Sequence, residues 1–270
     1  MGFRMKSFFF YLLLQLLLLD IARAEGPTLQ FIIDENFLIT HTLNKNTNKL
    51  PQHILKFRKD LKFQYSKEVL KLLDFKDMGP SALLIKIKNV GVGNLFTGAK
   101  AHPDYTRILQ ETQGHLNEVK REWESNFSKT YQFMKSITRI NLDQAFNVFI
   151  THPEVFQGRN LGENEIAWGR KSDWKNYSSV YLWHEVLHSF LKFNSKSHAL
   201  IELMTDDALK CALNGGTYPP FSVDGHPNLT DTKKQIYQKY WVKYLGDKKT
   251  NIIQLETIVI SDKSFLIQKR

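Results

Sequence analysis

The residues His184-Glu185-Val186-Leu187-His188 form an HExxH motif inside an apolar stretch of the chain. On a helix, residues four positions apart lie on one face, so both imidazoles project in the same direction. Two histidines presented this way can bind one zinc ion, with the glutamate placed beside a water molecule at the metal. The motif therefore predicts a helix over residues 179–193 and requires a further element to supply the remaining protein ligand.

A second helix is predicted over residues 197–213, where apolar residues recur at helical spacing. It carries Glu202 among apolar neighbours, and burying a carboxylate without a partner is costly. Catalytic zinc commonly takes two histidines, one carboxylate and one water. We therefore predict that Glu202 is the third ligand of one zinc ion. His198 is the rival donor, but its place at the start of this helix favours a capping or surface role.

Asp206 follows Glu202 by four residues and shares its helical face. From there its carboxylate can accept the outer N–H of a zinc-binding histidine, a bond that fixes the tautomer and orientation of the ring. We predict this orienting role for Asp206, with the neighbouring Asp207 as the alternative.

This pattern resembles the gluzincin metallopeptidases, in which HExxH on one helix is completed by a glutamate on the next, often as Glu-x-x-x-Asp. The resemblance is confined to the stretch from His184 to Asp207. It implies a zincin-like fold and zinc-dependent hydrolysis of peptide bonds with Glu185 as general base. The metzincin pattern does not fit, because Leu191 and Asn194 stand where it asks for Gly and for His or Asp.

Gluzincins usually add a His or Tyr that donates a hydrogen bond to the developing oxyanion. His226, in a loop flanked by glycine and proline, is the favoured candidate for this role. The alternatives are Tyr218, Tyr237 and Tyr240.

Residues 1–24 predict a secretory signal peptide, with a basic start, an apolar run from Phe8 to Leu19 and small residues before the cleavage site. That run is shorter than the ~20 residues that span a bilayer, so no stable membrane insertion is expected after cleavage. Cys211 is the only cysteine, which excludes an internal disulfide. We expect an exported protein, either secreted or located in the periplasm or cell envelope.

The formal net charge is +10, but the basic residues are scattered instead of forming one long stripe. Scattered charge is typical of a solvated surface. Because the sequence also lacks an aromatic and basic recognition motif, it disfavours nucleic-acid binding. The expected partner is a peptide or protein substrate, and the oligomeric state is left open.

The predicted fold class is α+β, zincin-like and mainly helical, with a small mixed sheet ahead of the HExxH helix. Residues 25–100 are expected to form an N-terminal α/β region that packs on a catalytic domain of residues 101–270. Within the first region, residues 28–43 favour extended structure and residues 51–75 favour helix.

A helical pattern then runs from Asp104 to Ile140, with a break near Asn126 as an alternative. Residues 145–150 favour a strand, which can pair with a second strand across the intervening loop. In zinc peptidases the sheet edge ahead of the HExxH helix typically binds an extended peptide by strand addition. We predict as that edge Glu165-Ile166-Ala167-Trp168-Gly169; a plain structural sheet is the alternative.

The sequence therefore favours an exported zinc metallopeptidase. A second reading is a catalytically inactive zincin-fold binding protein at the cell envelope. Against it stands the intact Glu185, since a purely structural zinc site has no need for a general base. A third reading is an exported scaffold in which the motif is coincidental.

Overall fold

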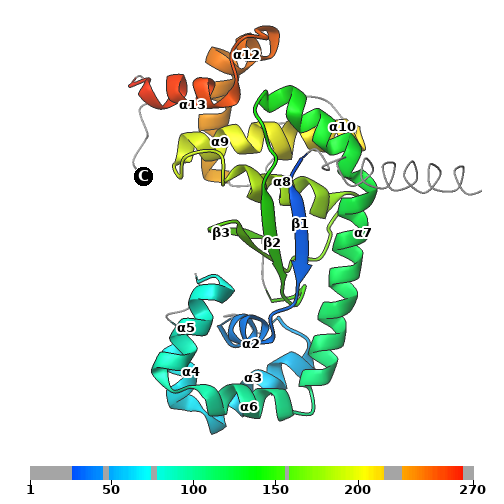
Figure 1. Ribbon diagram of the computed structural model, residues 1–270, viewed down its shortest axis with the longest axis vertical. Helices are drawn as coiled ribbons and strands as arrows, with labels where there is room; N and C mark the ends of the chain where they lie inside the picture. The colour runs from blue at the N-terminus through cyan, green and yellow to red at the C-terminus, as the bar shows by residue number, and fades with distance from the viewer. Residues whose placement is uncertain (1–25, 45–48, 74–77, 156–157, 216–226, 264–270) are drawn as a thin grey trace, which may run out of the picture.

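The structure, a computed structural model, describes residues 26–44, 49–73, 78–155, 158–215 and 227–263 (Figure 1). Helices dominate these residues, and a small mixed sheet lies between two groups of helices. The predicted α+β class, mainly helical with a small mixed sheet, is confirmed. The predicted signal peptide lies outside the described residues. None of the helices within them is both long and apolar enough to cross a membrane.

The sheet consists, in order of hydrogen-bonded neighbours, of β1 (Thr28–Ile32), β2 (Ala145–Ile150), β4 (Glu165–Trp168) and β3 (Arg159–Gly162). The first three strands are parallel, and β3 is antiparallel to β4. Pairing between residues 145–150 and the later strand is confirmed. This pairing is parallel, and the antiparallel hairpin of the sheet is formed by β3 and β4, whose turn places Glu163 and Asn164 at φ 48° and 63°.

The segment predicted as the sheet edge, Glu165 to Gly169, is not an edge, because β4 lies between β2 and β3. All four residues of β4 are buried, as is typical of an interior strand. A short apolar run indicates that a strand is buried, but it does not tell which strands flank it. The outer strand on this side of the sheet is β3.

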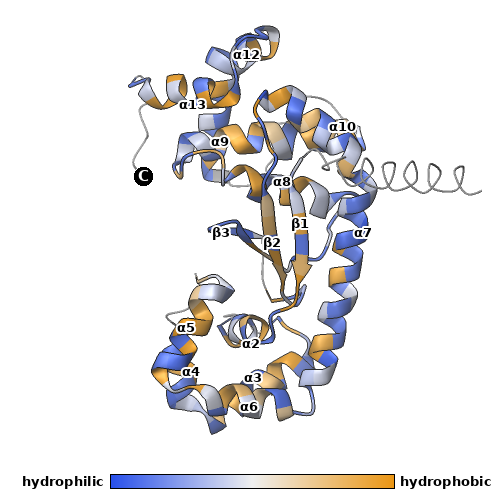
Figure 2. Cartoon of the chain, in the orientation of Figure 1, coloured by the Kyte–Doolittle hydropathy of each residue, from blue (hydrophilic) through white to orange (hydrophobic). Residues whose placement is uncertain are grey.

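Successive side chains of β2 face two different hydrophobic cores, as the alternation of a strand requires. Phe146, Val148 and Ile150 belong to the core shared with the HExxH helix. Phe149 points the other way, into the core of the N-terminal helices. Figure 2 shows the apolar character of this strand between the two helical layers.

The N-terminal helices are α2 (Glu35–Asn44), α3 (Gln52–Gln64), α4 (Ser66–Leu73), α5 (Pro80–Val90) and α6 (Gly93–Ala101). The helical prediction for residues 51–75 is confirmed by α3 and α4. The extended prediction for residues 28–43 is correct only for β1. Asp34 starts α2 by accepting the N–H of Phe37 at 2.8 Å. Every residue from Phe37 to Leu43 is buried, so the sequence of α2 shows no amphipathic period.

The long helix α7 (Tyr105–Thr138) runs beside both cores and connects the two groups of helices (Figure 1). Ile108 near its start packs into the N-terminal core, and Met134 near its end packs into the other. The helix is continuous at Asn126, whose side chain donates to Ser179 Oγ at 3.0 Å. The sheet likewise draws on both predicted regions, since β1 pairs with β2.

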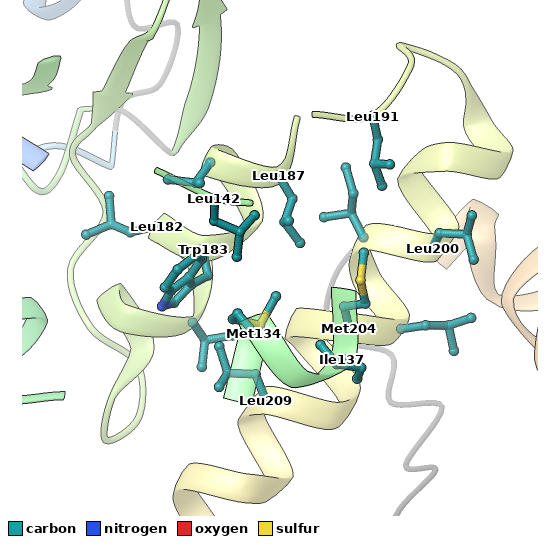
Figure 3. Packing of buried hydrophobic residues seen from close by; sticks show 14 of the residues in the cluster. Met134, Ile137, Leu142, Leu182, Trp183, Leu187, Leu191, Leu200, Met204 and Leu209 are labelled. Atoms are coloured by element: carbon teal, nitrogen blue, oxygen red, sulfur yellow. The ribbon is translucent and has the colours of Figure 1, made fainter. Parts of the chain in front are cut away.

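The C-terminal part begins with α8 (Tyr177–Leu187), α9 (Ser195–Glu202), the π-helical segment η1 (Leu203–Leu209) and α10 (Lys210–Asn214). It continues with η2 (Pro227–Leu229), α11 (Thr230–Ile236), the π-helical η3 (Tyr237–Trp241), α12 (Val242–Gly246) and α13 (Ile252–Ser261). Figure 3 shows Trp183 and Leu187 of α8 packed with Met134 of α7 and Met204 of η1. This core fixes α8 and α9 relative to each other.

Candidate metal centre

The start of α8 is held by α7. Glu122 Oε1 accepts the N–H of Ser179 at 2.7 Å, which satisfies a backbone donor of the first helical turn. Burial raises the pKa of Glu122, and hydrogen bonds from Ser179 and Ser178 oppose this effect. Because Val180, Trp183 and Leu187 are fully buried, the remaining face of α8 can present its histidines toward α9.

The two histidines of the HExxH motif meet a third histidine from α9. One ligand atom from each of His184, His188 and His198 lies within 4.8 Å of those of the other two. His184 Nε2 and His198 Nε2 are 3.1 Å apart. Two nitrogens bound about 2.0–2.1 Å from a tetrahedral zinc ion are about 3.3 Å apart. The three imidazoles are therefore close enough to hold one metal ion, and the separation of the His184 and His198 nitrogens is near that of two zinc ligands.

The placement of His198 differs from the capping or surface role expected from the sequence. Asn194 caps α9 instead, with Oδ1 accepting the N–H groups of Lys196 and Ser197 at 3.0 Å each. His198 thereby falls in the first turn of α9 and turns toward α8. The turn between α8 and α9 brings His198 to His184. Helical periodicity within either helix does not predict the path of that turn.

Glu202, predicted as the third ligand, is fully buried beside this group. Its Oε1 lies 3.8 Å from His198 Nε2, and its Oε2 lies 2.9 Å from Lys233 Nζ. The structure thus places the carboxylate next to the histidines and in an ion pair at the same time. Coordination by Glu202 stays a prediction, and His198 is the competing third ligand.

Asp206 contacts Nδ1 of His184, the ring nitrogen that faces away from the other two histidines, as its predicted role requires. Its Oδ1 lies 3.2 Å from His184 Nδ1 and accepts the Thr205 hydroxyl at 3.0 Å. A proton held on Nδ1 leaves the lone pair of Nε2 directed at the other histidines. The alternative, Asp207, instead lies 3.7 Å from Lys233 Nζ. The π-helical segment η1 carries both aspartates, and such segments are frequent at functional sites.

We predict that Asp206→Asn lowers the affinity for zinc by about 10–100-fold, because the neutral amide orients and polarises His184 less well. Competition with a coloured chelator measures this change. Asp207→Asn is the matched control, since Asp207 is adjacent in sequence but faces Lys233. A larger loss of zinc affinity in the Asp207 variant would show that the orienting acid is misassigned.

The electrostatic surroundings of His184 favour a cation. Burial alone lowers the pKa of this imidazole, but Asp206, Glu185 and Glu202 overcome that effect and raise it to about 9. The same carboxylates attract a metal ion. Further from the histidines, burial raises the pKa of Asp207 to about 7, opposed by Lys233. Burial in turn lowers the pKa of Lys233, but Glu202 and Asp207 reverse the direction, so it lies above its usual value.

Glu185 is buried and points to the outer strand of the sheet. Its Oε2 accepts the N–H of Asn160 at 2.6 Å, and the Asn160 side chain donates to the Glu185 carbonyl at 2.8 Å. Asn160 also donates to Ser189 Oγ at 2.9 Å, just beyond the motif. Three hydrogen bonds from one residue therefore tie β3 to the HExxH segment.

Sequence reasoning missed both Asn160 and Lys233. No motif marks Asn160, because its partners depend on how the β3–β4 hairpin meets α8. Lys233 carries a readable signal, since it lies three residues before the fully buried Ile236 on the apolar face of α11. A lysine on such a face needs a buried anionic partner.

Four residues remain as candidate oxyanion donors. His226, the favoured oxyanion donor, and Tyr218 lie outside the described residues. The Tyr240 hydroxyl donates to Asp262. Tyr237 is a partly buried residue packed against the core that α8 and α9 share.

A second group of side chains, at His53, Glu111 and His152, is also close enough to hold a metal ion. Both Nε2 atoms lie 2.8 Å from the same Glu111 oxygen, the length of a hydrogen bond. His152 Nδ1 accepts the N–H of Glu154 at 3.2 Å, so the ring proton resides on Nε2. This tautomer suits a hydrogen bond to Glu111, so the group fits a zinc ion less well than the three histidines do.

Comparisons of this chain with protein-family models, with curated proteins and with solved structures gave no match. The function of this chain is therefore inferred from the geometry and chemistry of the site itself.

Proposed function

We propose that this protein is an exported zinc-dependent metallopeptidase. The observation that supports this most is the convergence of His184, His188 and His198 within 4.8 Å, with Asp206 on the outer nitrogen of His184. A donor set of imidazoles with an orienting carboxylate is typical of zinc sites. Because the protein would supply only three ligands, a tetrahedral ion would keep one position for the water molecule that catalysis requires.

In this proposal each residue has a distinct task. The histidines hold the ion, with His198 or Glu202 completing the protein ligands. A bound zinc ion would polarise a substrate carbonyl and lower the pKa of a coordinated water to about 7. Glu185 takes the proton of the attacking water and passes it to the leaving amine. The peptide lies along the outer edge of β3, the strand bonded to Glu185 through Asn160.

A direct test is metal analysis combined with peptide hydrolysis. We expect about one zinc ion per purified chain and cleavage of some members of a random peptide library. A strong chelator should abolish cleavage, and added zinc should restore it. His188→Ala should lose the ion, whereas His53→Ala should keep it. A purified chain that binds zinc but cleaves no peptide would refute the proposed peptidase function.

A catalytically inactive zinc-binding protein is the second candidate. It is favoured by the contact of Glu185 with the Asn160 N–H, because this bond gives the glutamate a structural partner. This candidate predicts zinc binding and peptide binding without turnover. Comparing hydrolysis by the wild type and by Glu185→Gln separates the two, since an inactive protein gives the same background rate for both.

A further inference from the structure

Phe193 is an exposed aromatic residue beside the metal centre. Its side chain is 93% exposed, and its ring centroid lies 6.3 Å from that of His188. Single exposed apolar side chains are common on protein surfaces, so the place of Phe193 beside the histidine group, and not its exposure alone, sets this residue apart. Phe193 lies in the short connection between α8 and α9, so both metal-binding helices fix its position.

Hydrogen bonds on both sides of Phe193 hold this connection in place. Before it, the N–H of Lys192 donates to Glu256 Oε1 of α13 at 2.6 Å. After it, Asn194 caps α9, and the Ser197 hydroxyl donates to the same Glu256 oxygen. Glu256 is buried, so water competes little with these bonds. The ring of Phe193 is therefore presented on a rigid support, which lowers the entropy cost of binding.

We infer that Phe193 forms the binding surface for a large apolar side chain next to the scissile bond of the substrate. This inference rests on the proposed peptidase function and assigns its substrate class: peptides with an aromatic or large aliphatic residue beside the cleaved bond. Neighbouring residues of an extended peptide are about 3.4 Å apart. A side chain adjacent to a carbonyl held at the histidines can therefore reach a ring 6.3 Å from His188.

Phe63 provides a matched control. It is 90% exposed, on α3 of the N-terminal helices, and so resembles Phe193 in type and exposure. Figure 1 shows α3 and the connection between α8 and α9 separated along the long axis of the molecule. Removal of either ring changes the exposed apolar surface similarly, but only Phe193 stands at the metal centre.

The first experiment compares the zinc-loaded wild type, Phe193→Ala, Phe193→Leu and Phe63→Ala on two peptides that differ only in Phe or Gly beside the cleaved bond. We expect the wild type to prefer the Phe peptide. Phe193→Ala should reduce this preference in kcat/KM by about tenfold, mainly through KM, a size expected for one apolar contact. Phe193→Leu should retain most of it, and Phe63→Ala all of it. Zinc content should be equal in all four.

The second experiment measures binding without turnover. In the zinc-loaded Glu185→Gln background, fluorescence anisotropy should show about tenfold weaker binding of the labelled Phe peptide when Phe193→Ala is added. Equal cleavage of Phe and Gly peptides by the wild type, or an unchanged preference in Phe193→Ala, would overturn the inference and leave the peptidase standing. A wild type that hydrolyses no peptide overturns the peptidase itself, so the two failures are distinguishable.

Discussion

Replacing Glu185 with Gln should lower kcat/KM for peptide hydrolysis by about 10²–10⁴-fold, the usual contribution of a general base. An amide of the same shape cannot accept the proton of the attacking water at neutral pH. Its oxygen can still accept the N–H of Asn160, so the fold and the contact with β3 should persist. Peptide hydrolysis measured under equal zinc loading gives the size of the loss.

The control for this variant is Glu124→Gln, which changes a glutamate of α7 whose side chain is 61% exposed. It should keep wild-type hydrolysis. Zinc content must be unchanged in both variants, because Glu185 is not a predicted ligand. Full hydrolysis by Glu185→Gln with bound zinc would remove this residue from the mechanism and favour another base.

Local sequence signals are sufficient to predict the helices that carry a clear helical period or a motif. The sequence predicts the HExxH helix, the long helix α7 and the helix that carries Glu202, with ends that differ from the structure by several residues. α2 was missed because its residues from Phe37 to Leu43 are buried on every side, which removes the polar face that a helical period needs. Element type is therefore readable where a helical period or a motif marks the segment, as HExxH does for the largely buried α8.

The site shows the same division between local and non-local information. Asp206 was placed correctly beside a histidine because its spacing from Glu202 sets a shared face of one helix. The contact of His198 with His184 depends on the turn between α8 and α9, and that of Lys233 with Glu202 depends on the docking of α11. Strand order also depends on tertiary contacts, so the sequence of β4 does not reveal that β3 lies outside it. Residue spacing within one helix therefore predicts which side chains share a face. Contacts between different helices and strands cannot be predicted from such spacing.

Lys233 occupies a position where a single substitution has a large effect on stability. Its side chain is 1% exposed and lies between the fully buried carboxylates of Glu202 and Asp207. The ammonium group compensates negative charge that has been removed from water. Removing one partner of such a group is strongly destabilising, because the remaining charges stay buried without compensation.

We expect Lys233→Met to lower the free energy of unfolding by about 3–5 kcal/mol, measured by urea denaturation of the metal-free protein. Lys234→Met is the control, since Lys234 is the exposed neighbour on the same helix and should change stability by less than about 0.5 kcal/mol. Adding Glu202→Gln and Asp207→Asn to Lys233→Met should recover most of the loss, because the two carboxylates that pair with Lys233 are then neutral. Equal effects of the two lysine variants would contradict a buried ionic group beneath the metal centre.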